Sequence, residues 1–482
     1  MLSTSLCYRL LLLHFSGKFS FPFTTKFNNS MIIKESEEIL TEKFKIHGGE
    51  SLKGEVSIGG AKNSVLKLLA AAILVKGSTK IYNVPHLTDV DIMLNVLSDL
   101  GAVCNYNKEE KSVVIDASDI TSITAKYELV SKMRASFIIL GALMSRCREA
   151  IVALPGGCAI GERRVDFHIK GLEALGAKIK IENGYVHAKA SKLVGTDIYL
   201  DIPSVGATEN LMLASVLAEG STRIQNAAQE PEIIDLANFL NTMGADIQGA
   251  GTSEIVINGV KADCLHETEY TTIPDRIEAG TFMAAVVATK GKAIIKNVYP
   301  AHLTFFNDKL IKMGASIKLV EPTTIEVSAR SRLSSINFVT QPYPGFPTDL
   351  QAIAMTLLTT SNGVGIITES LYENRFMQVP DLRRMGADIH QDRNHAIVKG
   401  VKNLTGATVA ASDLRAGAAL VIAGLMANGE TIVEKLHHID RGYEEFEHKL
   451  QNMGAKITRY NEEDISGMPS MNSAILNTKG GI

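Results

Sequence analysis

One thiol and two guanidinium groups lie close together in a glycine-rich segment of the chain. Cys158 follows Pro155-Gly156-Gly157, and Arg163 and Arg164 come five and six residues after it. Glycines on both sides of a cysteine indicate a lid loop, and nearby arginines favour the reactive thiolate. A lone cysteine is more often structural. This setting instead predicts a residue that takes part in acid–base or covalent chemistry.

A second group of polar residues opens six apolar segments elsewhere in the chain. Basic residues at a helix start are unfavourable against the helix dipole, whereas a bound anion reverses that cost. Helix capping or an ordinary salt bridge explains any one of them, but the whole set indicates a shared anion site. Its members are Lys62, Asn63, Arg134, Ser204, Thr208, Asp275, Arg276, Glu278, Asp349, Asp413 and Arg415.

The six segments that these residues open are rich in alanine and almost free of charge. A helix that is apolar on every side is buried, so each segment predicts a core helix. The segments are 61–75, 134–146, 207–218, 277–290, 349–361 and 414–428.

A Gly-Ala pair recurs between these segments, each time after an amphipathic stretch and before an alternating one. We expect each glycine to end a helix in the left-handed conformation and a strand to follow. After the second pair, Lys178–Ile181, Asn183-Gly184 and Tyr185–Ala188 predict a hairpin. Six such repeats predict two domains of three units each. The glycines, 68 to 75 residues apart, are Gly101, Gly176, Gly244, Gly314, Gly386 and Gly454.

The composition sets the class of protein. The chain has 482 residues, a net charge of −3, 45% hydrophobic residues and 21% charged residues. It is therefore long and apolar enough for several cores, and its charge argues against a nucleic-acid partner. No apolar run reaches the roughly 18 residues of a membrane span, which argues against stable membrane insertion. The five cysteines form no CxxC pair, which argues against a zinc site and favours a reducing compartment such as the cytoplasm.

Both ends of the chain differ from the middle. Residues 1–34 hold four basic residues and no acidic one, a weak transit-peptide pattern. A disordered extension, or a start at Met31, explains them more simply. We expect residues 1–44 to be an N-terminal extension and residues 461–482 to be a flexible polar tail.

Nine short motifs between about Phe44 and Tyr460 together resemble the bacterial UDP-N-acetylglucosamine 1-carboxyvinyltransferases. The resemblance implies the enolpyruvyl transferase fold, with two inside-out α/β domains of three pseudo-repeated units each. It places residues 45–61 and 273–460 in one discontinuous domain and residues 62–272 in the other, with the active site between them. The motifs are Gly59–Ser64, Met133–Ser136, Pro155–Gly161, Val205–Thr208, Pro274–Glu278, Phe346–Asp349, Glu373–Phe376, Asp413–Ala416 and His438–Tyr443.

The resemblance also implies a reaction. The enolpyruvyl group of phosphoenolpyruvate moves to the 3′-hydroxyl of UDP-N-acetylglucosamine, and phosphate leaves, in the first committed step of peptidoglycan precursor synthesis. Phosphoenolpyruvate carries a phosphate and a carboxylate, so its site needs several cations. Each close pair is worth about 4 kcal/mol at an effective dielectric near 20, before desolvation. No metal or organic cofactor is implied. The oligomeric state stays open, with a monomer expected.

The family's functional residues map onto this chain position by position. Cys158 resembles the proton donor, which also forms a covalent adduct. Asp349 resembles the base at the sugar hydroxyl, and Asp413 a second carboxylate near the reacting carbon. His168 is expected to support the loop. The implied phosphoenolpyruvate contacts are Lys62, Asn63, Arg163, Arg375, Arg415 and Arg441, of which Lys62 and Arg441 also count as catalytic. The implied nucleotide-sugar contacts are Asn63, Arg134, Arg163, Arg164, Val165, Asp166, Phe167, Ser204, Val205, Gly206, Asp349 and Leu371.

The chain departs from the family pattern at one place. Asp201-Ile202-Pro203-Ser204 lacks a lysine that some members carry in the nucleotide-contact loop, so a lysine–diphosphate contact is absent. Because residue 158 is cysteine and not aspartate, we expect the epoxide antibiotic fosfomycin to alkylate it.

Two rival interpretations of the function remain. The first, 5-enolpyruvylshikimate-3-phosphate synthase, lacks the Pro-Gly-Gly-Cys loop. The second, a silent paralogue that only binds UDP-sugar, conflicts with the complete set of catalytic residues.

Overall fold

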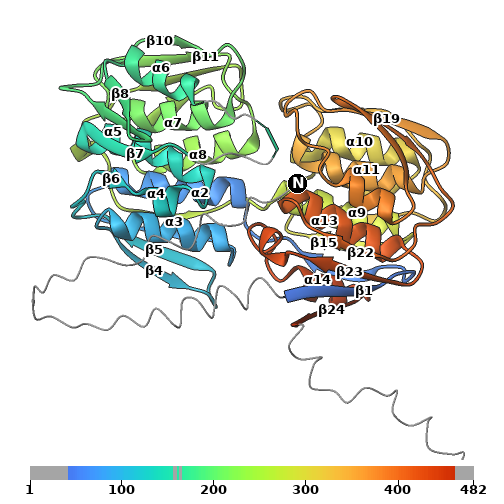
Figure 1. Cartoon of the computed structure of the whole chain (residues 1–482). Coiled ribbons are helices and arrows are strands. Elements are labelled where there is room, and N and C mark those ends of the chain that lie inside the picture. Colours follow the sequence, from blue (N-terminus) through green and yellow to red (C-terminus); the bar gives the residue numbers. More distant parts are fainter. Residues whose placement is uncertain (1–41, 156–159, 162–164, 462–482) are drawn as a thin grey trace, which may run out of the picture. The chain divides into compact units, whose positions relative to one another are not determined.

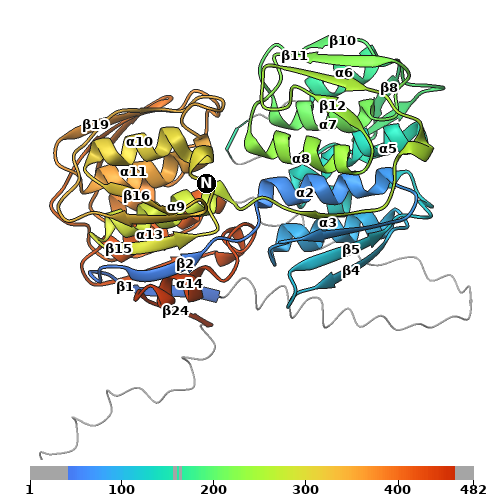
Figure 2. The same cartoon turned by 180° about the vertical axis from the view of Figure 1, so that it is seen from behind.

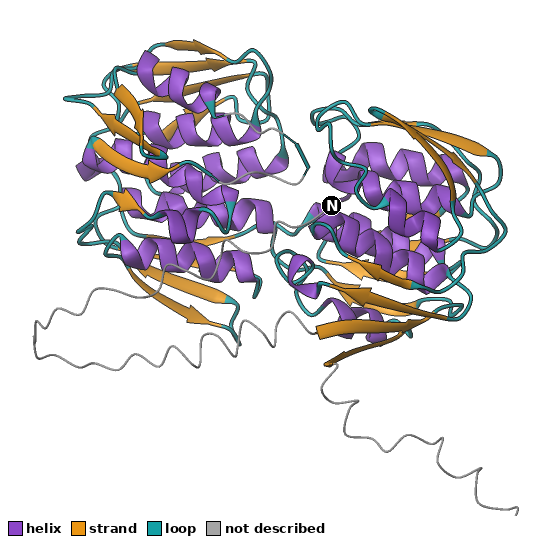
Figure 3. Ribbon diagram, in the orientation of Figure 1, coloured by secondary structure: helices purple, strands orange, loops and turns teal. Residues whose placement is uncertain are grey.

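The structure is a computed structural model that describes residues 42–155, 160–161 and 165–461. Within this part of the chain the strands form six four-stranded sheets. Figures 1 and 3 show the helices grouped together, with the strands on the outside of each group. The same part of the chain holds no helix that is long and apolar enough to cross a membrane.

Buried residues between Val65 and Leu265 form one continuous hydrophobic cluster, called core A here. Its sheets have the strand orders β14-β3-β5-β4, β6-β7-β9-β8 and β10-β11-β13-β12. The helices are α2 (Lys62–Ala71), η1 (Ala72–Leu74), α3 (Thr88–Asp99), α4 (Tyr127–Val130), η2 (Arg134–Ile138), α5 (Ile139–Cys147), α6 (Asp166–Ala174), α7 (Val205–Ser215), α8 (Pro231–Thr242) and η3 (Ala262–Cys264). The strands are β3 (Ser78–Tyr82), β4 (Val103–Asn107), β5 (Ser112–Asp116), β6 (Thr124–Ala125), β7 (Glu149–Ala153), β8 (Lys178–Glu182), β9 (Tyr185–Lys189), β10 (Asp197–Tyr199), β11 (Ser221–Gln225), β12 (Asp246–Gln248), β13 (Glu254–Asn258) and β14 (Thr268–Thr271).

A second cluster, core B, joins residues 44–58 to residues 277–457. Its sheets have the orders β16-β17-β15-β2, β18-β19-β21-β20 and β22-β23-β1-β24. The helices are α9 (Arg276–Ala288), η4 (Pro300–Leu303), α10 (Thr304–Met313), η5 (Thr348–Leu350), α11 (Gln351–Thr359), α12 (Val379–Arg384), α13 (Leu414–Met426), η6 (Leu436–His438) and α14 (Phe446–Asn452). The strands are β1 (Glu42–His47), β2 (Lys53–Ser57), β15 (Lys292–Lys296), β16 (Ser316–Glu321), β17 (Thr324–Ser328), β18 (Phe338–Val339), β19 (Val364–Thr368), β20 (Asp388–Asp392), β21 (His395–Lys399), β22 (Thr408–Ala410), β23 (Glu430–Glu434) and β24 (Lys456–Asn461).

The first two strands belong to sheets that the C-terminal half otherwise builds. β1 pairs with β23 on one side and β24 on the other, and β2 pairs in parallel with β15. In Figure 2 both strands, drawn in blue, lie with core B. The chain therefore passes between the two cores twice. At these passages the Ala61 N–H donates to the Ile273 carbonyl at 2.7 Å. β1 begins at Glu42, inside the segment expected to be an extension.

The six predicted core helices are confirmed. Each lies in one of the two cores, and two of them, η2–α5 and η5–α11, begin with a 3₁₀ turn that the sequence pattern did not predict. All six Gly-Ala glycines have positive φ, from 90° to 110°, as their predicted place after a helix requires. The predicted hairpin is also confirmed, as β8 and β9 around Asn183-Gly184. The six sheets repeat one pattern of a parallel pair followed by two antiparallel pairs.

Candidate active site

A lysine and an arginine meet on one buried carboxylate. Lys62 is the first residue of α2, and Asp89 lies in the first turn of α3. Lys62 Nζ is 2.8 Å from Asp89 Oδ2, and Arg441 Nε donates to Asp89 Oδ1 at 2.8 Å. Burial raises the pKa of the Asp89 carboxyl, but Lys62 and Arg441 bring it below its ordinary value. Asp89 is thus an anion that bridges two cations.

The surroundings favour the charged form of Lys62 less than they favour that of Asp89. Burial lowers the pKa of its ammonium group, Asp89 opposes this shift, and Arg415 and Arg441 add to it. A further anion placed here would help to keep Lys62 charged.

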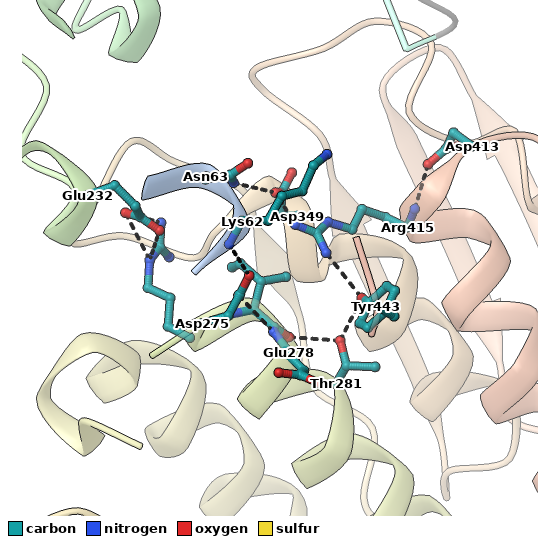
Figure 4. A network of polar contacts seen from close by, with 12 residues as sticks. Lys62, Asn63, Glu232, Asp275, Glu278, Thr281, Asp349, Asp413, Arg415 and Tyr443 are labelled. Atoms are coloured by element: carbon teal, nitrogen blue, oxygen red, sulfur yellow. Dashed lines mark hydrogen bonds and ion pairs between the residues drawn. The ribbon is translucent and has the colours of Figure 1, made fainter. Parts of the chain in front are cut away.

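A second carboxylate, Asp349, joins two more cations. It lies in η5, directly before α11. Arg375 Nη2 donates to its Oδ1 at 2.8 Å and Arg415 Nη2 to its Oδ2 at 2.9 Å. Asn63 Nδ2 reaches the same Oδ2 at 3.5 Å (Figure 4). Burial alone would raise the pKa of Asp349, but Arg415 and Arg375 hold it well below its ordinary value.

Arg415 is also fixed from its other side. Its Nη1 donates to the Tyr443 hydroxyl at 3.2 Å, and that oxygen lies 2.9 Å from Thr281 Oγ1 (Figure 4). Burial opposes the charge of Arg415, but Asp349 raises its pKa above the ordinary value. Arg415 therefore stays charged, in one orientation.

Two other carboxylates cap helices. Asp413 accepts hydrogen bonds, at 2.9 and 3.1 Å, from the two N–H groups that follow Leu414 at the start of α13. Asp275 does the same for α9 at 2.7 and 3.0 Å, and its other oxygen accepts from the Lys62 N–H at 3.1 Å. Because an N-cap satisfies otherwise unpaired donors, both side chains fix where these helices begin. Asp275 also ties the start of α9 to the start of α2 (Figure 4).

Three residues of the predicted anion site are engaged elsewhere. Arg276 Nε donates to both carboxylate oxygens of Glu232, at 3.0 and 3.3 Å. Lys449 Nζ donates to Glu278 at 2.6 Å, and the Thr208 hydroxyl accepts a backbone N–H at 3.1 Å. Ordinary salt bridges therefore account for Arg276 and Glu278, and a backbone hydrogen bond accounts for Thr208.

The nucleotide-sugar contacts implied by the resemblance lie at the starts of helices. Ser204 caps α7 by accepting from the Ala207 N–H, and Val205 and Gly206 form its first turn. Val165 precedes α6, Asp166 and Phe167 begin it, and Arg134 begins η2. In core B, Leu371 is 36% exposed.

His168 lies behind the start of α7. Its Nδ1 is 2.8 Å from Asn210 Nδ2, so the amide donates and the ring carries its proton on Nε2. Burial, helped by Arg134, lowers the pKa of His168 to about 3, so the ring is neutral. A Cβ on Gly206 would lie 3.4 to 3.5 Å from this ring. His168 thus packs beneath Gly206 as a neutral ring that accepts a hydrogen bond from Asn210.

Cys158, Arg163 and Arg164 lie outside the described residues. Ile160 and Gly161, which lie between them in the sequence, are described, and the Ile160 carbonyl accepts the Asn374 N–H at 3.1 Å. Asn374 directly precedes Arg375, so this part of the loop lies beside one of the Asp349 cations.

Sequence reasoning missed Asp89 and Tyr443. Asp89 looked like an ordinary acid in the first turn of a helix, where the dipole favours one. Tyr443 belonged to a recognised motif but had no assigned role. A buried carboxylate needs a cation, and the only available signal for Asp89 was an acidic residue in the first turn of an amphipathic helix.

The arrangement has a clear chemical meaning. Lys62 with Arg441, and Arg375 with Arg415, form two cation pairs, each held by one carboxylate. A ligand that carries two separate anionic groups matches such a site, because each group can replace one carboxylate.

The comparisons agree with this geometry. Residues 46–466 match the sequence profile of the family described as EPSP synthase (3-phosphoshikimate 1-carboxyvinyltransferase). The enolpyruvyl transferase NikO from Streptomyces tendae superposes with a TM-score of 0.79 at 26% identity, covering 87% of this chain and 99% of NikO. An EPSP synthase from Acinetobacter baumannii, 18% identical over 87% of this chain and all of its own, shares the fold with a TM-score of 0.67. The fold and the cation-rich site define an enolpyruvyl transferase.

More similar relatives narrow the class. UDP-N-acetylglucosamine 1-carboxyvinyltransferase 2 of Carboxydothermus hydrogenoformans is 54% identical over 422 residues, which is 87% of this chain and 100% of that protein. UDP-N-acetylglucosamine 1-carboxyvinyltransferase 1 of Staphylococcus aureus is 49% identical over 423 residues, again 87% of this chain and 100% of the relative. The chain belongs to the UDP-N-acetylglucosamine 1-carboxyvinyltransferase family, and it is therefore a transferase.

Proposed function

We propose that this protein transfers the enolpyruvyl group of phosphoenolpyruvate to the 3′-hydroxyl of UDP-N-acetylglucosamine and releases phosphate. Relatives about half identical along 87% of the chain carry the name of that activity. The observation that carries the proposal is the pairing of four cations with Asp89 and Asp349. Phosphoenolpyruvate offers one phosphate and one carboxylate to two such pairs.

The phosphate binds at Lys62 and Arg441, together with Arg163 from the cysteine loop. The carboxylate binds at Arg375 and Arg415, whose forked donors suit a planar anion. In the structure Asp89 and Asp349 hold these cations. Substrate binding therefore exchanges one anion for another, and no cation is left unpaired.

The same exchange prepares Asp349 as a base. Held by two arginines, its carboxylate is weakly basic. When the substrate carboxylate takes those arginines, the pKa of Asp349 rises and it can accept the 3′-hydroxyl proton. Cys158 donates a proton to the vinyl CH₂, while the sugar oxygen bonds to the adjacent carbon. The Cys158 thiolate then takes a proton back from the new methyl group. The bond between the phosphate oxygen and the carbon breaks, phosphate leaves with that electron pair, and the double bond forms again.

The two cores support a division into two domains, residues 62–272 and residues 45–61 with 273–460, which we propose as the structural units. We propose the cytoplasm as the location. The described cysteines Cys104, Cys147 and Cys264 are free thiols, as a reducing compartment favours.

Phosphate release from phosphoenolpyruvate tests the proposed reaction. We expect release that requires UDP-N-acetylglucosamine in the wild-type protein and collapses in Cys158→Ala. Binding of the nucleotide sugar without any phosphate release would support the silent paralogue instead. Release that requires shikimate 3-phosphate would support the synthase.

A further inference from the structure

A buried lysine–glutamate pair joins two helices within core A. Lys67 Nζ, on α2, lies 3.4 Å from Glu209 Oε1, on α7, and the two side chains are 11% and 1% exposed. Neither residue belongs to the substrate contacts given above, and the proposed mechanism uses neither.

Stability alone does not account for this pair. A buried ion pair is a poor source of stability, because desolvation offsets much of its attraction. Beyond this ion pair, Glu209 Oε1 accepts no hydrogen bond from the described residues. Burial raises the pKa of Glu209 to about 7, Lys67 opposes the shift, and Glu232 and Glu230 add to it.

The position of the pair indicates its role better than its contribution to stability does. Lys67 Nζ also donates to the Asn63 carbonyl at 2.5 Å. Asn63 lies in the first turn of α2, and its amide reaches Asp349. Glu209 lies one helical turn beyond Val205 and Gly206, at the start of α7. One ammonium group therefore links the first turn of α2 to the first turns of α7.

We propose that Lys67 and Glu209 are positioning residues that set Asn63 and the start of α7 at the distance that the nucleotide sugar requires. This inference rests on the proposed function. With Glu209 charged, Lys67 stays between the carboxylate and the Asn63 carbonyl. When Glu209 is neutral, the hold on Lys67 weakens and both helix starts move more freely. The nucleotide sugar is affected more than phosphoenolpyruvate, because only the nucleotide sugar contacts both helix starts, α2 through Asn63 and α7 through Ser204 to Gly206.

The test compares Glu209→Gln, Lys67→Met and the double variant with the wild-type protein. Glu219→Gln is the matched control, because Glu219 forms an exposed pair with Lys192 at 2.8 Å. Calorimetry gives the Kd for UDP-N-acetylglucosamine, and steady-state kinetics give kcat and both KM values.

For each single variant we expect a rise of about threefold to tenfold in the Kd and KM of the nucleotide sugar. We expect kcat to change less than about twofold, and the KM of phosphoenolpyruvate to rise less than that of the nucleotide sugar, because phosphoenolpyruvate contacts Asn63 but not the start of α7. The double variant should be affected less, since no unpaired buried charge remains.

The pH dependence of binding adds a second readout. Glu209 faces Lys67 from α2 and Glu230 and Glu232 from the start of α8, where Arg276 neutralises Glu232. Protonation of Glu209 should weaken wild-type binding as the pH falls from about 8 to 6. Glu209→Gln should lack this dependence. His168, with its pKa of about 3, stays neutral throughout that range.

Two results would overturn the inference. One is an unchanged Kd at every pH in Glu209→Gln. The other is a fall in kcat together with equal rises in both KM values, in variants whose melting temperature is lower than that of the wild-type protein. Wild-type protein that does not bind UDP-N-acetylglucosamine would contradict the proposed function as well, whereas wild-type binding with an unchanged variant contradicts only this inference.

Discussion

At the scale of single residues, charge is paired before substrate arrives. Asp349 keeps two arginines in place, and the same contacts make it a weak base until an anion replaces it. We predict that Asp349→Asn lowers kcat by about 10² to 10⁴. The KM of phosphoenolpyruvate should not rise, because the substrate no longer displaces a carboxylate. Steady-state phosphate release measures both. An unchanged kcat would exclude Asp349 as the base.

Asp89 helps to keep Lys62 protonated, so replacing Asp89 should change the pH dependence of kcat/KM for phosphoenolpyruvate. Burial already lowers the pKa of Lys62, and Asp89 opposes that shift. In Asp89→Asn the pKa of Lys62 falls further, so Lys62 loses its proton at a lower pH. We predict that kcat/KM for phosphoenolpyruvate begins its alkaline decline earlier than in wild type. Adding Lys62→Arg to the variant should remove the earlier decline, since a guanidinium does not titrate there. Superimposable wild-type and variant profiles would contradict this role.

Cys158 remains a prediction from the sequence, because it lies outside the described residues. Preincubation with fosfomycin should abolish turnover and add the mass of the antibiotic to the peptide that holds Cys158. Cys158→Asp, which lacks the thiol, should show neither effect. Full activity of the treated wild-type protein, with no mass gain, would rule out alkylation.

At the scale of elements, a capping carboxylate can serve the helix, the substrate or both. Asp413 accepts two backbone N–H groups at the start of α13. We predict that Asp413→Ala lowers the free energy of unfolding by about 1 kcal/mol, whereas Asp413→Asn, an equally good cap, changes it little. If Asp413 also acts near the reacting carbon, kcat falls in both variants. Denaturant unfolding with kinetics separates the roles, and full activity in Asp413→Asn would leave only the cap.

Much of the element pattern was predictable, because the signals are local. Fully apolar segments predicted the six core helices, and Gly-Ala pairs predicted where the amphipathic helices end. The partners of β1 were not predictable from local pattern, since β23 and β24 lie about 400 residues away in the chain. Side-chain partners such as Asp89 for Arg441 depend on the same distant pairing. Residue types at helix starts therefore predicted Lys62, Arg415 and Asp349. The resemblance added Arg375 and Arg441, and Asp89 was not predicted.

At the scale of the whole molecule, the N-terminal strands complete sheets of the C-terminal half. β1 has a partner strand on each side, so core B is incomplete without it. We predict that a variant beginning at Leu40 keeps the wild-type melting temperature and turnover. A variant beginning at Gly48 should lose both, because β24 then has no partner strand and β23 keeps only β22. Thermal unfolding and phosphate release compare the two. Equal stability of both variants would contradict this view of the fold.

The central claim is the identity of the acceptor, and one competition experiment tests it most directly. Wild-type protein is incubated with phosphoenolpyruvate and equal amounts of UDP-N-acetylglucosamine and shikimate 3-phosphate, and the products are identified by mass spectrometry. The account predicts a UDP-sugar heavier by one enolpyruvyl group, formed in step with phosphate, and unchanged shikimate 3-phosphate. Enolpyruvyl transfer to shikimate 3-phosphate, or no transfer to either acceptor, would contradict it.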